Sequence, residues 1–287
     1  MYTIETCSIC QNNNLINHGT IKDHSITGLD FNLSWCGKCN TLITNPRPEL
    51  QELNKFYQHS NYVSHSNKAN NVINSIYKIA RRFTIKWKRR LIEKQVNTGS
   101  LLDFGCGTGQ FIDYMSAKKW ETYGVDPLIN KSHGQEKKIF NSIDELTKKD
   151  FNVITLWHVL EHVYDPLGTL QSLKKILSRN GLLYIAVPNT GSLDRRFYSK
   201  YWSAYDVPRH FYHFSQSSIR MLFKLTGLKL IHTIPMKLDA YYISLLSNKY
   251  KDGKYRFLKS INEAWIINRK AKVHNQYSSN MYIATHH

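Results

Sequence analysis

The sequence lacks any run of 18 uninterrupted apolar residues, so no membrane-spanning helix is expected. The first ten residues also lack a basic region followed by an apolar run, so no secretory signal peptide is predicted and a cytoplasmic location is expected. Acidic residues are scarce, since 21 Asp and Glu against 39 Lys and Arg give a net charge of +18. Apolar residues are not scarce: 41% of the 287 residues are hydrophobic, which excludes wholesale disorder and predicts one large domain with a small addition.

The excess positive charge is concentrated in two segments. Residues 68–95 contain nine basic residues and one acidic residue, and residues 249–272 contain eight and two, so together these segments carry +14 of the +18. Excess charge of this kind favours an anionic partner such as RNA, a lipid surface or an anionic substrate. The stretch from Leu101 to Pro188 is far more balanced. The excess charge is therefore evidence about an anionic partner, or an anionic substrate near the entrance to a site. It says little about the reaction itself.

The first basic segment is predicted to be an amphipathic helix. Its apolar residues recur at steps of three and four and form one stripe, made of Val72, Ile76, Ile79, Phe83, Trp87 and Leu91. Most of its lysines and arginines fall off that stripe. Such a helix either packs on the main domain with a solvated basic face or binds RNA, anionic lipid or a phosphorylated substrate, and the sequence leaves both possibilities open.

Cysteine is also scarce, and four of the five cysteines form two pairs with the same spacing, Cys7 with Cys10 and Cys36 with Cys39. Two residues between paired cysteines allow both thiolates to face one tetrahedral ion, and two such pairs complete a Cys₄ zinc shell. Without a secretory signal, disulfides are not expected. Because a closed shell has no open coordination position, the predicted zinc is structural. Residues 1–45 are therefore predicted to form a small zinc-ribbon-like module.

A glycine-rich segment follows an apolar strand at Leu101. It reads Leu-Leu-Asp-Phe-Gly-Cys-Gly-Thr-Gly, and a helix is expected to begin near Phe111. The spacing of its glycines differs from the dinucleotide fingerprint, whose third glycine is replaced by Gln110, and no Gly-Lys-Ser/Thr of a P-loop follows. Asp103, just before the first glycine, suits a ligand that carries an ammonium group better than a pyrophosphate.

Strands and helices alternate after this segment, which predicts a parallel sheet with helices on both faces. A second strand ends in Asp126, 19 residues after Gly107, where a carboxylate can accept hydrogen bonds from both ribose hydroxyls. A short third strand is expected near Phe140. The other predicted elements are a fourth strand at residues 151–156, a helix at 170–177 that stops at Asn180-Gly181, and a fifth strand at 182–188.

The order of these motifs resembles the class I S-adenosylmethionine-dependent methyltransferases. The resemblance rests on Asp-x-Gly-x-Gly-x-Gly, on the acidic end of the second strand, and on Trp-His-Val-Leu-Glu-His-Val after the fourth strand. It implies a Rossmann-like seven-stranded sheet, with residues 228–235 and 279–285 as an antiparallel pair. The methyltransferase domain is then expected at residues 98–287, and residues 46–97 form a linker and the basic helix.

The resemblance also implies roles for individual residues. Asp103, the glycine loop and Trp157 would line the methionine half of the cofactor, and Asp126 would bind the ribose hydroxyls. A segment before the basic helix could fold over the cofactor. The complete set of predicted cofactor-binding residues is Asp103, Gly105, Cys106, Gly107, Gly109, Asp126, Pro127, Asn141, Trp157, Tyr62 and His65.

Methyl transfer to oxygen commonly needs a base, and His158, His162 and His210 are the candidates. Each could instead be a packing residue or a wall of the cofactor pocket. The order of zinc module and methyltransferase domain resembles bacterial enzymes that act on sugars, lipids or other small metabolites. The sequence therefore predicts methylation of a small molecule, most simply at oxygen, and its charge allows that molecule to be anionic. Two alternatives stay open: an RNA methyltransferase that docks RNA through the zinc module and basic helix, and a non-catalytic zinc-stabilised scaffold.

Overall fold

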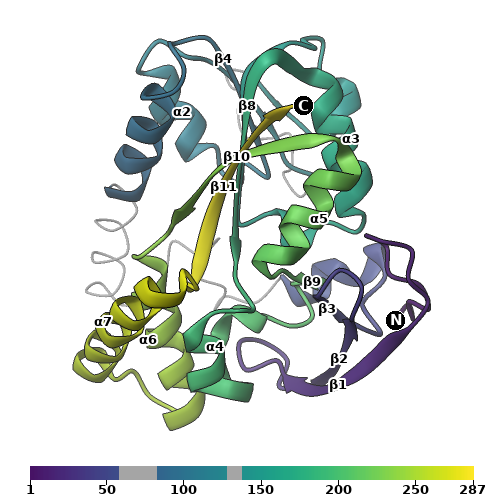
Figure 1. Ribbon diagram of the computed structural model, residues 1–287, viewed down its shortest axis with the longest axis vertical. Helices are drawn as coiled ribbons and strands as arrows, with labels where there is room; N and C mark the ends of the chain where they lie inside the picture. Colours follow the sequence, from purple (N-terminus) through teal and green to yellow (C-terminus); the bar gives the residue numbers. More distant parts are fainter. Residues whose placement is uncertain (58–82, 128–137) are drawn as a thin grey trace.

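The computed structural model describes residues 1–57, 83–127 and 138–287, and these residues form two sheets (Figure 1). The larger sheet has seven strands in the order β10-β11-β8-β7-β4-β5-β6. Its middle strands are parallel, whereas β11 runs antiparallel to both of its neighbours. The strands are β4 (Ser100–Phe104), β5 (Glu121–Val125), β6 (Ile139–Phe140), β7 (Phe151–Trp157), β8 (Leu177–Pro188), β10 (Leu228–Pro235) and β11 (Ser279–His286). The predicted Rossmann-like, seven-stranded sheet is confirmed.

Helices cover both faces of this sheet and one of its ends. Figure 1 shows α2 on one side and α3 with α5 on the other, while α4, α6 and α7 gather at the lower end. Each face has its own core: Leu170, Leu173 and Leu222 pack in one, and Phe111 and Met115 in the other. The α-helices are α2 (Gln110–Ser116), α3 (Pro166–Ile176), α4 (Leu193–Tyr198), α5 (Gln216–Thr226), α6 (Asp239–Asp252) and α7 (Phe257–His274). Short 3₁₀ helices are η1 (Leu50–Phe56), η2 (Ile143–Glu145), η3 (Leu160–His162), η4 (Ser199–Tyr201) and η5 (Ser203–Tyr205).

The expected stop at Asn180-Gly181 is wrong. Helix α3 ends earlier, at Ile176, and β8 begins at Leu177 and runs through both residues. A shift of register between Phe151 and Val153 of β7 absorbs the extra residues of β8. The Asn180-Gly181 pair therefore lies in an irregular strand. The same two residues are common in turns, so the local sequence alone does not distinguish the two cases.

The N-terminal segment forms most of the second sheet, whose order is β1-β2-β3-β9. Strands β1 (Leu15–Lys22), β2 (Asp30–Cys36) and β3 (Thr41–Thr44) are antiparallel neighbours. The fourth strand, β9 (Tyr212–His213), comes from the region expected to belong to the methyltransferase domain. The sheet thus crosses the predicted boundary at residue 45, and the two parts of the chain are joined by main-chain hydrogen bonds.

The basic helix is described only over residues 83–93, so Val72, Ile76 and Ile79 lie outside the described residues. Phe83 was predicted to face the core and is instead 64% exposed. Ile92 is completely buried, with Trp87 and Leu91 packed beside it. The buried side of the helix thus differs from the predicted stripe, and Lys88 also turns inward, onto the ring of Trp157. Among the described helices, none is long and apolar enough to cross a membrane.

Candidate active site

The glycine loop connects β4 to α2 at the carboxyl edge of the large sheet. Gly105, Gly107 and Gly109 all have positive φ, the left-handed region in which only glycine is unstrained. A Cβ on Gly105 would lie 2.4 Å from Cγ2 of Val159, so this glycine allows the segment after β7 to touch the loop. Among the residues that the structure describes, no atom lies within 4 Å of a Cβ placed on Gly107. The loop is therefore packed behind Gly105 and leaves room for a ligand at Gly107.

Two acidic side chains border this loop. Asp126 follows β5, and its Oδ2 accepts a hydrogen bond of 2.8 Å from the backbone N–H of Gly107. The side chain of Asn141 donates to the carbonyl of Asp126 at 3.5 Å. Asp103 is buried at the end of β4, and its Oδ1 accepts a hydrogen bond of 2.6 Å from Thr155. Two carboxylates beside an open glycine turn fit a ligand with hydroxyl groups and a positive charge, as the ribose and sulfonium of S-adenosylmethionine provide.

A lysine that the sequence did not single out lies beside Asp103. Lys88 Nζ is 4.1 Å from the centre of the Trp157 ring, a cation–π distance. Burial lowers the pKa of Lys88 to about 8, and burial raises the pKa of Asp103 to about 7. Each charge favours the charged form of the other. Trp157 also contacts Phe111 edge-on at 5.7 Å, which gives this wall of the predicted cofactor site an aromatic lining.

His158 directly follows β7 and lies between two carboxylates. Its Nε2 is 3.0 Å from Oδ2 of Asp239, and its Nδ1 is 3.4 Å from Oε1 of Glu161. Burial alone would lower the pKa of His158, but the interactions with Asp239 and Glu161 raise it to about 10. The imidazole is therefore a cation at neutral pH, with no lone pair to accept a proton. Its backbone is strained, with φ of 57° in a residue other than glycine.

His162 has the opposite electrostatic character. Its Nδ1 is 3.0 Å from the carbonyl oxygen of Arg209 and 3.1 Å from the hydroxyl of Tyr57. Because a carbonyl only accepts hydrogen bonds, the proton belongs on Nδ1 and the lone pair on Nε2. Burial and the nearby His210 lower the pKa of His162 to about 4, so the ring is neutral. A neutral imidazole oriented through its other nitrogen is the usual form of a general base.

His210 packs edge-on against His162, with ring centres 4.5 Å apart. Its Nδ1 donates a hydrogen bond of 2.9 Å to the carbonyl of Ala204. Glu161 lies beside both rings and is only 1% exposed, and within the described part of the chain its carboxylate oxygens have no hydrogen-bond partner besides the ion-pair contact with His158. One ligand atom from each of these three residues lies within 4.8 Å of the others, so together they could also hold a metal ion.

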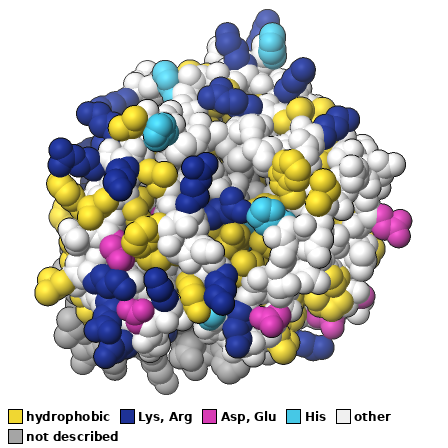
Figure 2. All heavy atoms as spheres, turned by 60° about the horizontal axis from the view of Figure 1, so that its bottom comes forward, with side chains coloured by type: hydrophobic (Ala, Val, Ile, Leu, Met, Phe, Trp, Pro, Cys, Tyr) yellow, Lys and Arg dark blue, Asp and Glu magenta, His cyan; other side chains and the backbone are white. Residues whose placement is uncertain are grey.

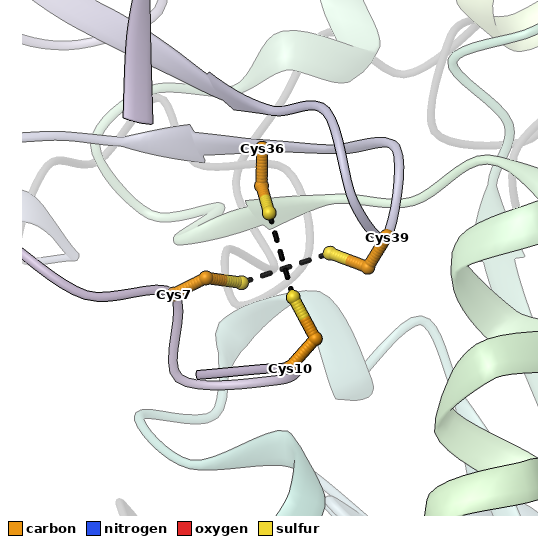
Figure 3. A group of neighbouring side chains, drawn as sticks. All are labelled: Cys7, Cys10, Cys36 and Cys39. Carbon is orange, nitrogen blue, oxygen red and sulfur yellow. Dashed lines mark hydrogen bonds between the residues drawn. The ribbon is translucent and has the colours of Figure 1, made fainter. Parts of the chain in front are cut away.

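The four paired cysteines converge in the N-terminal module, as Figure 3 shows. The sulfur atoms of Cys7 and Cys39 are 3.6 Å apart, and those of Cys10 and Cys36 are 3.5 Å apart. These separations are much longer than a disulfide bond and close to the edge of about 3.8 Å that a tetrahedron with Zn–S distances of about 2.3 Å has. All four side chains are buried. The predicted residues thus fit a structural zinc ion.

Two predicted cofactor residues, Tyr62 and His65, lie outside the described residues. Pro127 is exposed, and Cys106 is buried with its sulfur next to Gly124. Sequence reasoning missed Asp239, which lies 81 residues from its partner His158. In the sequence, Asp239 is only an acidic residue that shortly follows a predicted strand. Its role depends on the chain returning to the sheet edge where His158 lies, and the sequence does not show that.

A methyltransferase domain model matches residues 77–233, more than half of the chain and the whole glycine-loop and histidine region. The chain belongs to this methyltransferase domain family. The predicted family and fold are thereby confirmed. The glycine loop, Asp126 and the three candidate histidines described above all lie within the matched residues.

Curated relatives of this methyltransferase domain include the ubiquinone biosynthesis O-methyltransferase of Histophilus somni, 31% identical over 34% of this chain and 47% of the relative. The corresponding enzyme of Pelagibacter ubique is 29% identical over 36% of this chain and 48% of the relative. The chain thus spans about half the length of the curated relatives it matches. Among solved structures, magnesium protoporphyrin IX methyltransferase from Synechocystis PCC 6803, with bound S-adenosylhomocysteine, superposes with a TM-score of 0.53 at 13% identity, over 83% of this chain and all of that one. That likeness concerns the fold alone.

Proposed function

We propose that this protein transfers a methyl group from S-adenosylmethionine to an oxygen atom of a small-molecule acceptor. The observation that carries the proposal is the open turn at Gly107 beside Asp126, together with a neutral histidine, His162, after β7. S-adenosylmethionine would supply an electrophilic methyl group on a sulfonium. Asp126 would bind the ribose hydroxyls, while Asp103 and the Trp157 ring would face the positively charged end. The relatives named above are ubiquinone biosynthesis O-methyltransferases, which supports oxygen over the RNA alternative.

Two residues that follow β7 have different proposed roles, one as the general base and one as a fixed cation. His162 Nε2 accepts the proton of the acceptor hydroxyl, and the carbonyl of Arg209 holds the ring in the required tautomer. His158, fixed as a cation by Asp239 and Glu161, stabilises the oxygen as it gains negative charge. His158 therefore acts through its charge, and His162 is the base. His210 orients His162 by edge-on packing rather than exchanging a proton itself.

Cofactor binding can be tested by calorimetry with S-adenosylmethionine. A Cβ on Gly107 would enter the space proposed for the cofactor, so Gly107→Ala should weaken binding at least tenfold. The left-handed backbone of an alanine at this position would also cost about 1–2 kcal/mol of conformational free energy. Gly253→Ala is a matched control, because Gly253 has φ of 72° and equally open surroundings but lies at the end of α6. Wild-type protein that does not bind, or equal binding by both variants, would refute the proposed site.

Transfer to oxygen can be tested with isotope-labelled methyl donor and a set of phenols, catechols, sugars and carboxylic acids. With an acceptor found, His162→Gln should lower kcat by about 10²–10⁴ and leave KM nearly unchanged. His286→Gln, a histidine at the far end of β11, should have no effect. The assay is run with and without a chelator, so that a metal ion held by Glu161, His162 and His210 would be recognised. Label found only on nitrogen or carbon would contradict O-methylation.

A further inference from the structure

Helix α7 presents most of its larger apolar side chains to solvent, and its buried face consists mainly of small residues. The buried face consists of Ser260, Ala264, Ile267 and Ala271. On the opposite face, Leu258 is 86% exposed, Val273 78% and Trp265 52%. Ile261 and Ile266 are exposed beside them. A helix that merely packs on a domain has the reverse arrangement, with its large apolar residues inside.

Positive charge is interspersed with the apolar residues of this outer face. Lys259, Arg269, Lys270 and Lys272 of α7 are all exposed, and the guanidinium of Arg269 lies 5.4 Å from the ring centre of Trp265. The two acidic residues of this region are already engaged. Glu263 accepts hydrogen bonds from Tyr198 and Asn248, and Asp252 forms ion pairs with Arg256 and Lys259. Figure 2, which brings this end of the molecule forward, shows hydrophobic and basic side chains interspersed over the face.

We infer that α7 is an interfacial helix that docks on an anionic lipid surface. Exposed Leu, Ile, Val and Trp with Lys and Arg among them suit a helix that lies in the plane of an anionic bilayer surface. The 18 residues of α7 span about 27 Å, long enough for several side chains to enter the boundary region together. A second copy of this chain fits the face poorly, because both copies would bring the same positive charge.

Docking through α7 would also place the candidate active site near the lipid. Helix α6 packs along α7, and Asp239 at its first turn forms the ion pair with His158. A lipid-bound acceptor could therefore approach the site from the surface on which the protein rests. The inference about α7 itself does not depend on the proposed reaction, since it rests on exposure and charge alone.

Vesicle sedimentation with the full chain tests the inference. The protein should bind phosphatidylcholine vesicles that contain phosphatidylglycerol, bind less as salt increases, and bind weakly to phosphatidylcholine alone. The double variant Leu258→Gln, Val273→Gln should bind at least tenfold less, because each change removes apolar area that would enter the lipid. The control Ile16→Gln, Leu29→Gln removes two exposed apolar residues of the N-terminal module and should bind normally.

Tryptophan emission gives an independent measurement. Anionic vesicles should shift the emission to shorter wavelength, and Trp265→Phe should remove most of that shift. No binding to anionic vesicles, or unchanged binding by the α7 double variant, would overturn the inference. If light scattering finds that the wild-type protein is a dimer and the double variant a monomer, and neither binds vesicles, the face would be assigned to self-association instead.

Discussion

Replacing Arg209 should test how the N-terminal module is held to the rest of the protein. The guanidinium is completely buried and donates to Asp23 of the β1–β2 connection at 2.8 Å and to Asp206 at 2.7 Å. It also donates to Ser25 and to the carbonyls of Phe56 and Val207. Arg209→Met would therefore leave two buried or nearly buried carboxylates without their cation.

The magnitude follows from this geometry. Removing one partner of a buried ion pair typically costs about 3–5 kcal/mol, because the remaining charge stays desolvated. Asp23→Asn should cost less, about 2 kcal/mol, since Asp206 still neutralises Arg209 and the introduced amide can keep some of the hydrogen bonds from Ser25 and Thr27. Arg256→Met, which breaks an exposed ion pair with Asp252, should cost less than about 1 kcal/mol.

Urea denaturation at constant free zinc measures these losses, with the double variant Asp23→Asn, Arg209→Met closing the cycle. The double variant should lose less free energy of unfolding than the sum of the single losses. Additive losses, or an Arg209→Met loss no larger than that of Arg256→Met, would refute the reasoning.

The same pair predicts a pH dependence. Burial alone would raise the pKa of Asp23, but the hydrogen bond and charge of Arg209 hold it well below its ordinary value of 3.8. A lowered pKa means that the ionised carboxylate stabilises the fold above pH 3.8, and that this stabilisation is lost as pH falls towards the folded-state pKa. Wild-type protein should therefore lose stability below that pH more steeply than Asp23→Asn. Parallel curves for the two proteins would contradict the assignment.

Two further predictions concern the metal and the reaction. Metal analysis should find about one zinc per chain. The Cys36→Ser variant should lose the zinc and unfold at a lower temperature, whereas Cys106→Ser should retain it. A zinc content that Cys36→Ser leaves unchanged would exclude the Cys₄ site. With a neutral His162 and a cationic His158, these two histidines should limit kcat/KM only below about pH 5 and near pH 10, whereas any change near pH 7–8 belongs to Asp103 and Lys88. An ionisation near pH 6.5 that controls the rate and disappears in His162→Gln would contradict this pair of roles.

The sequence predicted the large sheet because its signals are local. An apolar strand, a glycine turn and an acidic strand end follow one another along a short stretch around Asp103, and family resemblance supplied the strand order. The predicted metal site of the paired cysteines also rests on a local signal, since a two-residue spacing limits the directions in which the two thiolates can face. These parts of the fold needed no knowledge of distant contacts.

The electrostatic roles within the site could not be read from the sequence. His158 and His162 are four residues apart and looked equivalent as bases, yet one is held as a cation by Asp239 and the other is kept neutral by burial. Lys88 belongs to the basic segment, for which the sequence left open a solvated face or a binding surface, and it lies over Trp157. Each assignment depends on a residue brought close by tertiary packing, which periodicity does not encode.

The N-terminal module is connected to the proposed base as well as to the fold. Strand β3 pairs with β9, and the hydroxyl of Thr44 donates to the carbonyl of His210. Arg209, which binds Asp23 through its side chain, supplies the carbonyl that orients His162. A zinc ion that fixes the cysteine shell would therefore help to fix the segment that sets the tautomer of His162. On this reasoning a zinc ion held there would be structural in its coordination, and it would contribute to the reaction by positioning a histidine rather than by any chemistry of its own.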